Sequence, residues 1–530
     1  MVFSIKRGLG MIKDITLRIR PDKIHDLEYI KEYAAKALKM DIPDVGAVQA
    51  IKRSVDARGR SPVFQIQARV YSGEPMEDLL QPVTYKPVRP GKKAIIVGSG
   101  PAGLFAALRL IENGILPIIL ERGKDVRERR FDLKTLQTEG NVNPDSNYCF
   151  GEGGAGTYSD GKLYTRSTKR GDVKKILSIL VLHGAIRDIL VNAHPHIGSN
   201  RLPGIIRAVR NTILKCRGEI HFNSRVTGLI LKNGQILGVR TKNSEFISDA
   251  VILATGHSAR DVYELLDKNQ ILLEAKPYAM GVRVEHPQDL INTIQYGKSK
   301  DSPFLPAAAY SLACQVGQAG VYSFCMCPGG MLIPASTAPG ELVLNGMSNS
   351  LRNLPYANAG MVVTIDSHQY GHLEEAFRHF SGLEFQKQME QKAFLAGGRT
   401  QAAPAQILTD FLEDRVSRIL PAASYIPGMV SYPLKEILGP YITDALKQAF
   451  QIFGQKMKGY VTKEAKLLAV ESRTSSPVRI PRMADTRMHP QIRGLFPAGE
   501  GAGYAGGIVS SAIDGDVTAD AVLAFLAGEG

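Results

Sequence analysis

The chain has no tryptophan and only five cysteines among its 530 residues, at positions 149, 216, 314, 325 and 327. An odd and sparse set of cysteines argues against a disulfide-stabilised secreted scaffold and for a reducing compartment. Residues 1–7 also lack the apolar stretch and the cleavage site of a secretion signal. We therefore expect a cytoplasmic protein.

The chain also lacks a long apolar run that is free of helix breakers. The longest uncharged stretch is Ser302–Gly340, which contains five prolines and several glycines. Proline removes a backbone donor and breaks a helix, so this stretch cannot form a spanning helix of about 20 residues. We expect neither a membrane-spanning helix nor a membrane partner.

Positive charge is abundant, but it is not concentrated in runs. The net charge is +14, yet no basic run exceeds two residues, and aromatic residues are not interleaved with the basic ones. Residues 1–92 hold 17 Lys and Arg against 11 Asp and Glu. This pattern favours a globular protein that binds anionic small molecules, with nucleic acid as the less favoured partner. The oligomeric state is left open.

The most informative motif lies at residues 94–103, Ala-Ile-Ile-Val-Gly-Ser-Gly-Pro-Ala-Gly. The apolar run 94–97 predicts a strand, and Gly98 the tight turn that follows it. Gly100 allows the backbone to approach a diphosphate, and Gly103 allows the next helix, 102–113, to pack on the strand. The N-terminus of that helix would direct its amides at the phosphates.

A second apolar strand, residues 118–120, completes the βαβ unit and ends at Glu121. This acid lies 18 residues after Gly103, at the spacing from which a carboxylate accepts hydrogen bonds from ribose hydroxyls. It favours FAD or NAD over NADP, whose 2′-phosphate it would repel.

The pattern GxGxxG occurs three times, beginning at Gly98, Gly151 and Gly501. Only the first has a preceding strand, a following helix, a second strand and an acid. Taken alone, the other two matches are better interpreted as glycine-rich turns without a nucleotide.

We divide the chain into a β-α-β-β module (1–88), a first nucleotide-binding segment (89–275), an inserted domain (276–458) and a return segment (459–530). A proline-punctuated linker, 81–90, leaves the first module. In the inserted domain we expect helices around 372–395, 405–420 and 443–457, and near the C-terminus a helix over 508–525.

Stretches along nearly the whole chain carry a resemblance to a known family. They are residues 52–58, 151–163, 324–330, 471–479 and 499–507. Together they resemble uncharacterised bacterial FAD-dependent dehydrogenases, within the two-dinucleotide-binding flavoproteins of glutathione-reductase type. The resemblance implies an α/β fold with an FAD-binding Rossmann-like parallel sheet, an inserted mixed substrate domain and a small α+β N-terminal module.

The resemblance also implies roles for matching residues. Adenosine would lie near Glu121, Arg122 and Val226, and the ribityl chain near Glu500. The full set of implied FAD-binding residues is Gly98, Gly100, Pro101, Ala102, Gly103, Glu121, Arg122, Gly153, Gly154, Thr157, Lys162, Val226, Ala254, Thr255, Gly256, Gly499, Glu500, Gly506, Gly507 and Ile508. The last helix would begin beside the flavin ring and stabilise negative charge on it.

Three residues are candidates for catalysis: Lys162, Glu471 and Arg473. Lys162 could place a charge at the flavin ring, or it could be a solvated loop lysine. Glu471 and Arg473 could form a buried ion pair. Alternatively, Arg473 and Arg479 could clamp a substrate carboxylate, although a structural role is favoured.

The cysteine and histidine positions give weaker indications of a chemical role than these three residues do. Cys325 and Cys327 could exchange electrons with a flavin, but a CxC disulfide is geometrically strained, and two buried apolar thiols are the favoured interpretation. His257 could act as an acid or base, although a structural histidine is favoured. The histidines and cysteines have no metal-binding spacing, so we expect no metal.

The sequence thus predicts an FAD-dependent oxidoreductase that exchanges a hydride with a small-molecule substrate, with NAD(P)H as a possible transient reductant. Two alternatives remain: a flavoprotein that binds RNA through the N-terminal module, and an FAD-bound scaffold or sensor without catalysis.

Overall fold

The N-terminal module is a three-stranded antiparallel sheet with one helix. The computed structural model describes residues 10–165 and 169–528. Strand β1 (Met11–Ile19) is followed by α1 (Leu27–Leu38), β2 (Ala47–Asp56) and β3 (Val63–Ser72), and β3 lies between β1 and β2. Leu17, Ile19 and the alternating apolar residues of β3 pack against α1, as their spacing predicts.

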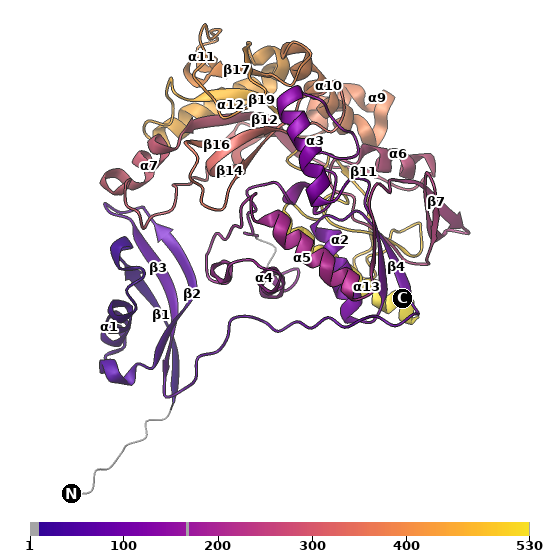
Figure 1. Ribbon diagram of the computed structural model, residues 1–530. Coiled ribbons are helices and arrows are strands. Elements are labelled where there is room, and N and C mark those ends of the chain that lie inside the picture. The colour runs from indigo at the N-terminus through magenta and orange to yellow at the C-terminus, as the bar shows by residue number, and fades with distance from the viewer. Residues whose placement is uncertain (1–9, 166–168, 529–530) are drawn as a thin grey trace, which may run out of the picture.

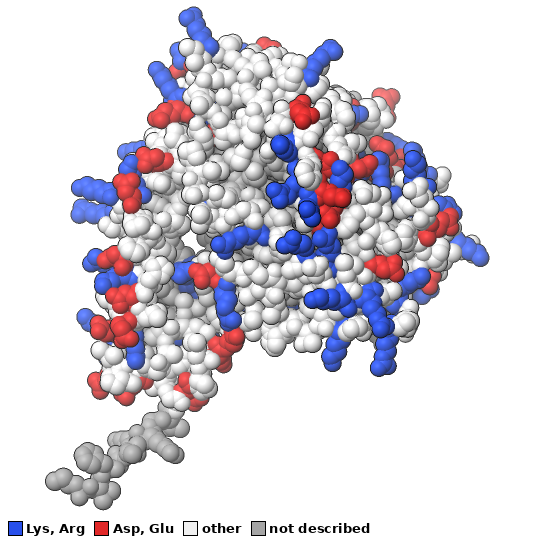
Figure 2. Space-filling model, in the orientation of Figure 1, with Lys and Arg blue, Asp and Glu red and all other residues white. Residues whose placement is uncertain are grey.

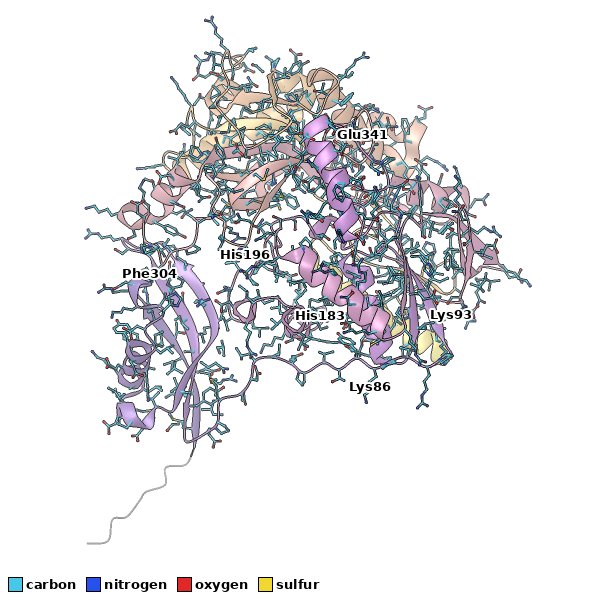
Figure 3. All side chains as sticks on the ribbon, viewed as in Figure 1. Lys86, Lys93, His183, His196, Phe304 and Glu341 are labelled. Carbon is cyan, nitrogen blue, oxygen red and sulfur yellow. The ribbon has the colours of Figure 1, made fainter. Side chains whose placement is uncertain are left out.

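The module contacts the rest of the protein through one edge and one end. Arg53 of β2 exchanges backbone hydrogen bonds with Val191 and Ala193, and its guanidinium bonds to Asp188 at 2.5 Å. At the end of the module, the ring of Phe304 lies 6.5 Å from that of His25 (Figure 3). On the face shown in Figure 2, basic and acidic side chains are mixed over these strands.

The predicted nucleotide-binding region is built on a five-stranded parallel sheet (Figure 1). Its order is β21-β10-β4-β5-β6, so β4 is central. The bounds are β4 Lys93–Val97, β5 Leu116–Leu120, β6 Glu219–His221, β10 Val251–Leu253 and β21 Leu495–Pro497. Because both faces of the sheet are covered, the strands are mostly apolar, except for the edge strand β6, which is Glu-Ile-His.

The two faces of this sheet have different covers. Ala94 and Ile96 of β4 face a core formed with four helices, whereas Ile95 and Val97 face the small antiparallel sheet β7-β8-β9 and helix α6. The helices of the first face are α2 Pro101–Glu112, α4 Val173–Leu182, α5 Leu202–Lys215 and α13 Ile508–Ala527. The second face has β7 Val226–Lys232, β8 Gln235–Thr241, β9 Glu245–Ile247 and α6 Arg260–Lys268. A further helix, α3 Val126–Glu139, precedes the second glycine-rich loop.

The middle region is an eight-stranded, mainly antiparallel sheet. Its path is β13-β14-β16-β12-β19-β17-β18, and β15 pairs with β14. The strands are β12 Tyr278–Pro287, β13 Ala313–Val316, β14 Ala319–Pro334, β15 Leu344–Ser348, β16 Tyr356–Ile365, β17 Ala403–Ile407, β18 Met429–Ser431 and β19 Lys466–Glu471. The helices are α7 Gln288–Tyr296, α8 Ser367–Tyr370, α9 Glu374–Phe377, α10 Ser381–Ala396, α11 Leu408–Leu412 and α12 Lys435–Lys456. A short pair, β11 Glu274–Ala275 and β20 Val478–Arg479, lies beside it.

Two features of the middle region differ from the sequence-based expectation. The helix expected over 405–420 is wrong for most of its length, because β17 occupies 403–407 and α11 ends at Leu412. β17 pairs with β18 and β19, so tertiary strand pairing overrides the apparent helical spacing. β19 also belongs to this sheet, although the predicted boundary assigned residues from 459 onward to the return segment.

Helix α13 packs closely on the first turn of α2, and Gly515 makes this approach possible. A Cβ atom on Gly515 would lie 2.0 Å from the carbonyl oxygen of Ala102. We expect Gly515→Ala to lower the melting temperature, because overpacking of about 1–3 kcal/mol exceeds the gain in helix propensity of about 1 kcal/mol.

The matched control is Gly204→Ala in α5, where an added Cβ meets no heavy atom within 4 Å. It should leave the melting temperature unchanged or raise it. Thermal unfolding of the FAD-free variants measures both effects. Equal melting temperatures for the two variants would show that the contact between α13 and α2 is not tight.

Candidate functional site

The turn from β4 into α2 is shaped by three glycines with different roles. Gly98 has φ +104°, and a Cβ there would lie 2.4 Å from the carbonyl oxygen of Ala254. A Cβ on Gly103 would lie 2.0 Å from the carbonyl oxygen of Gly98, so Gly103 brings the helix against the turn, as predicted. At Gly100 the nearest heavy atom would be 3.9 Å away. This open position is where a ligand can approach the backbone.

The first turn of α2 is left without a side-chain cap. Its N-cap is Gly100, and no side chain accepts a hydrogen bond from its amides. Four amides at a helix N-terminus have no partner within the helix, and the helix dipole adds partial positive charge there. The start of α2 is therefore suited to bind an anion such as a diphosphate.

The second glycine-rich loop lies directly against the first. The amide of Gly153 donates to the carbonyl of Ser99 at 2.9 Å, and a Cβ on Gly154 would lie 3.1 Å from the Cα of Gly100. Arg129 of α3 is fully buried, and its guanidinium donates to four backbone carbonyls around this loop, those of Asn147, Tyr148, Glu152 and Gly154. A buried charge thus holds the loop in place.

The third glycine-rich segment precedes α13. Gly499 has φ +75°, and its amide donates to the Asp514 carboxylate at 2.7 Å. Arg482 and Arg487 both pair with Asp514, which lowers its pKa although burial alone would raise it. Gly507 is the N-cap of α13, and this helix also starts without a side-chain cap.

These segments enclose one cavity of about 340 Å³. All of the predicted cofactor-binding residues line it except Gly103, Gly153 and Thr157. Gly103 supports the helix. The Thr157 hydroxyl donates to the Glu152 carbonyl, and Gly153, which has no Cβ, packs against this hydroxyl. The second and third glycine motifs are therefore walls of the same cavity as the first, and neither forms a βαβ unit of its own.

Glu121 lines the cavity, but its carboxylate is already used by the protein. One oxygen accepts from the amide and the hydroxyl of Ser99, and the other accepts from the amides of Gly123 and Gly151. Since a carboxylate has about four acceptor sites, these bonds occupy them all. Glu121 joins the first loop to the second, and its predicted contact with ribose would compete with these bonds.

A group of charged residues at this end of the cavity escaped the sequence analysis, apart from Arg122. Arg122 donates to Asp145 and Asp261 and lies 4.1 Å above the ring of Phe150. Arg225 also donates to Asp261, at 3.0 Å. In the sequence, the one signal for Arg225 was its position directly before Val226, which was predicted to lie near the adenosine.

Arg473 lines the cavity, but it has no free donor for a substrate. Its five N–H groups are directed at Glu390, Glu341, Ser258 and Thr337. The predicted ion pair with Glu471 is wrong, and so is the clamp with Arg479, which lies outside the cavity lining. Long-range partners on α10, on the β14–β15 connection and at Ser258 satisfy this guanidinium.

The carboxylates around Arg473 have divergent acidities. Burial and the charge of Glu390 raise the pKa of Glu341 to about 7. The pKa of Glu390 is lowered, because Arg473 and Arg260 outweigh its burial. Beside them, burial and Arg473 lower the pKa of His257 to about 4, so this imidazole is neutral at pH 7 and cannot act as a cationic acid.

Glu471 pairs with Arg283 of β12 and not with Arg473. The guanidinium of Arg283 lies 3.3 Å from Glu471, and both side chains are almost completely buried. Burial raises the pKa of Glu471 to about 7. Glu471 lines a smaller cavity that adjoins the first one.

Lys162 lines the main cavity and is not a freely solvated lysine. Its ammonium lies 3.4 Å from Asp160, 3.7 Å from the sulfur of Cys325 and 3.5 Å from that of Cys327. Cys325 also lines the cavity, so the interpretation as two buried apolar thiols is wrong for this residue. No periodicity could have revealed this, because Cys325 has φ +44° in an irregular part of β14.

Two further groups on the cavity wall are the Thr255 hydroxyl, which lacks a hydrogen-bond partner, and the Glu500 carboxyl, whose pKa is raised. The Thr255 hydroxyl is buried without a hydrogen-bond partner. Burial raises the pKa of Glu500 to about 7, although Lys276 opposes this. Unsatisfied buried polar groups are rare in proteins, so Thr255 is a position at which a ligand would supply a hydrogen bond.

The residues that the structure describes are 10–165 and 169–528. They contain no group of His, Cys, Asp and Glu arranged to hold a metal ion. In the same ranges, no helix is both long enough and apolar enough to cross a membrane.

Comparisons with solved structures give only weak likenesses. A glycine oxidase from Bacillus cereus is 12% identical, with 82% of this chain and 96% of that chain covered and a TM-score of 0.29. The flavin-dependent brominase Bmp2 is 12% identical, with 82% and 79% covered and a TM-score of 0.35. These values are too low to transfer a fold or an activity.

Sequence families give a firmer result. Residues 277–474 match the family described as FAD-dependent protein, C-terminal domain-like, which supports FAD as the cofactor, and residues 11–71 match a domain of unknown function, DUF8436. An uncharacterized protein of Clostridium beijerinckii is 38% identical over 520 residues, which cover 94% of this chain and 96% of that protein. The chain belongs to the same family as this clostridial protein.

Proposed function

We propose that the protein is an FAD-dependent oxidoreductase that exchanges a hydride with a small-molecule substrate. The observation that carries this proposal is the convergence of two uncapped helix N-termini, those of α2 and α13, on one glycine-lined cavity. Such a cavity offers two sites for negative charge without a formal cation at either. The family match at residues 277–474 supports FAD as the group that carries this charge.

The residues that line the cavity have the chemistry to hold each part of FAD. Gly98, Gly100 and the first amides of α2 would hold the diphosphate. Arg122 and Val226 would lie beside the adenosine, and Thr255 would supply its free hydroxyl. Glu500 would face the ribityl chain, and the start of α13 would lie at the ring.

Bound FAD supplies two-electron and hydride chemistry, and the chain supplies binding, orientation and electrostatics. The amides at the start of α13 stabilise negative charge in the cavity. Lys162 adds a formal positive charge on the cavity wall. The Arg473 network fixes the wall between the nucleotide-binding region and the middle sheet.

The substrate would enter from the side of the middle sheet. Phe324, Cys325 and Asn345 reach the cavity from β14 and β15, and Thr474 from the segment after β19. These side chains combine an aromatic face, a sulfur atom and hydrogen-bonding groups, which suits a small polar molecule. NAD(P)H as a transient reductant stays part of the proposal.

Gly100→Ala tests FAD binding without disturbing the fold. The added methyl group would point into open space, and the backbone at Gly100 (φ −69°) is allowed for alanine. We expect FAD affinity to fall at least tenfold, a loss of about 1.4 kcal/mol, because the methyl group would occupy the space of the diphosphate. Titration of FAD-free protein with FAD, followed by absorbance, measures this.

The melting temperature of FAD-free Gly100→Ala should equal that of the wild type, and Gly204→Ala should bind FAD normally. If Gly100→Ala bound FAD as tightly as the wild type, the diphosphate would not lie at this turn.

Anaerobic reduction tests the activity itself. The purified protein should show a flavin absorbance spectrum in the visible range, and a physiological two-electron donor should bleach it. We would mix the protein separately with NADH, with NADPH and with a panel of small reductants, thiols included. Bleaching by one of them within seconds supports the oxidoreductase and identifies the donor class, whereas a spectrum that no donor changes would favour a scaffold or sensor.

A further inference from the structure

Strand β14 is distorted where it reaches the cavity. Cys325 has φ +44°, a conformation that residues other than glycine rarely adopt, and the register of β14 with β16 shifts between Phe324 and Cys327. The distortion leaves Cys325 on the cavity wall, while Cys327 is fully buried behind it. Unfavourable backbone conformations persist mainly where function requires them.

Both sulfur atoms lie against one ammonium group. Lys162 Nζ is 3.7 Å from Cys325 Sγ and 3.5 Å from Cys327 Sγ. The thiol of Cys327 donates to the carbonyl of Cys325 at 3.3 Å, so its sulfur is folded back toward Cys325. Arg283 donates to the same carbonyl, at 3.2 and 3.4 Å.

The cations around these sulfurs outnumber the carboxylates that pair with them. Lys162 and Arg352 share the single carboxylate of Asp160, at 3.4 and 2.6 Å. Arg283 is paired with Glu471. One positive charge is therefore left without a formal partner, and a cation beside a sulfur favours its thiolate. A thiolate at Cys325 supplies that partner.

The two thiols also differ in acidity. The neighbouring Cys327 side chain, together with Lys162 and Arg283, holds the pKa of Cys325 well below its usual value, although burial opposes this. The neighbouring Cys325 side chain and burial raise the pKa of Cys327. The other ionisable groups that face Cys325 are Asp160, Glu471 and Glu500, and its negative charge raises the pKa of both glutamates. Because the Cys327 thiol uses its proton to donate to the Cys325 carbonyl, we assign Cys327 as the thiol and Cys325, which faces the cavity, as the thiolate.

We propose that Cys325 and Cys327 form a two-electron thiol–disulfide pair on the cavity wall, which reacts with low-molecular-weight disulfides. The Cys325 thiolate attacks one sulfur of the disulfide, the disulfide bond breaks, and one thiolate leaves. Cys327 then loses its proton to that thiolate and attacks Cys325, which releases the second half as a thiolate. The small disulfide is reduced, and a Cys325–Cys327 disulfide is formed. Because a CxC disulfide is strained, it is labile and is readily reduced again.

This inference goes beyond the proposed hydride exchange, because the disulfide reacts with a thiolate and not with a hydride, and it rests on the proposed function only for the two-electron donor that restores the thiols. The reaction of the pair itself needs no FAD. The tests below therefore use FAD-free protein, so that their failure is distinct from a failure to bind or reduce FAD.

The first test is alkylation of the folded protein with iodoacetamide from pH 5 to pH 9.5, followed by mass spectrometry of its peptides. We expect the midpoint for Cys325 to lie well below that of Cys314, whose pKa is raised by burial. Lys162→Met should slow the alkylation of Cys325 at pH 7 at least tenfold, and Lys162→Arg should restore most of the rate.

The matched control is Lys175→Met, which removes a half-buried lysine paired with Glu112 and Asp516 and distant in sequence from both cysteines. It should leave the Cys325 profile unchanged. A Cys325 midpoint near that of Cys314, or a Cys325 profile that Lys162→Met does not change, would overturn the assignment of the thiolate.

The second test is incubation with oxidised glutathione. The wild type should form a Cys325–Cys327 disulfide without retained glutathione. Cys327→Ser should retain one glutathione on Cys325, because no second thiol can displace it, and Cys314→Ser should behave as the wild type. A stable glutathione adduct on wild-type Cys325, or no adduct in Cys327→Ser, would overturn the pair.

Discussion

The site depends on the close contact between the first turn of α2 and the helix α13, which is 400 residues later in the chain. Gly515 permits the backbones of α2 and α13 to touch. The carboxylate of Asp514, one residue earlier, accepts a hydrogen bond from the amide of Gly499. The same turn of α13 thus fixes both the position of α2 and the third glycine-rich segment. Because both helices start without caps, this one contact sets two sites for negative charge in a single cavity.

The parts of the site that the sequence predicted are those that local rules determine. The unit β4–α2–β5 follows from an apolar strand, glycines at fixed spacing and a helix that begins after Gly100. The C-terminal helix follows from its continuous apolar periodicity. In both cases, the residues that decide the structure lie within about one helix length of each other, so no tertiary information is needed.

The parts that were missed or wrong depend on partners that are distant in sequence. Glu471 pairs with Arg283, 188 residues earlier, and Arg473 is satisfied by Glu390 and Glu341. The expected helix over 405–420 gives way to β17, because β18 and β19 offer strand pairing. Sequence spacing identifies a residue that can form an ion pair, but it does not identify the oppositely charged residue that the fold places beside it.

Lys162 links the two proposed roles of the cavity through charge. With Cys325 as a thiolate, the Lys162 ammonium and the Cys325 sulfur neutralise each other. A diphosphate in the cavity would then be stabilised mainly by the amides at the start of α2. Formation of a Cys325–Cys327 disulfide removes the thiolate and leaves Lys162 with positive charge that Asp160 shares with Arg352. That charge then acts on the rest of the cavity, where it stabilises negative charge more strongly. The oxidation state of the sulfurs would therefore change how readily a bound cofactor accepts electrons, although neither sulfur need touch it.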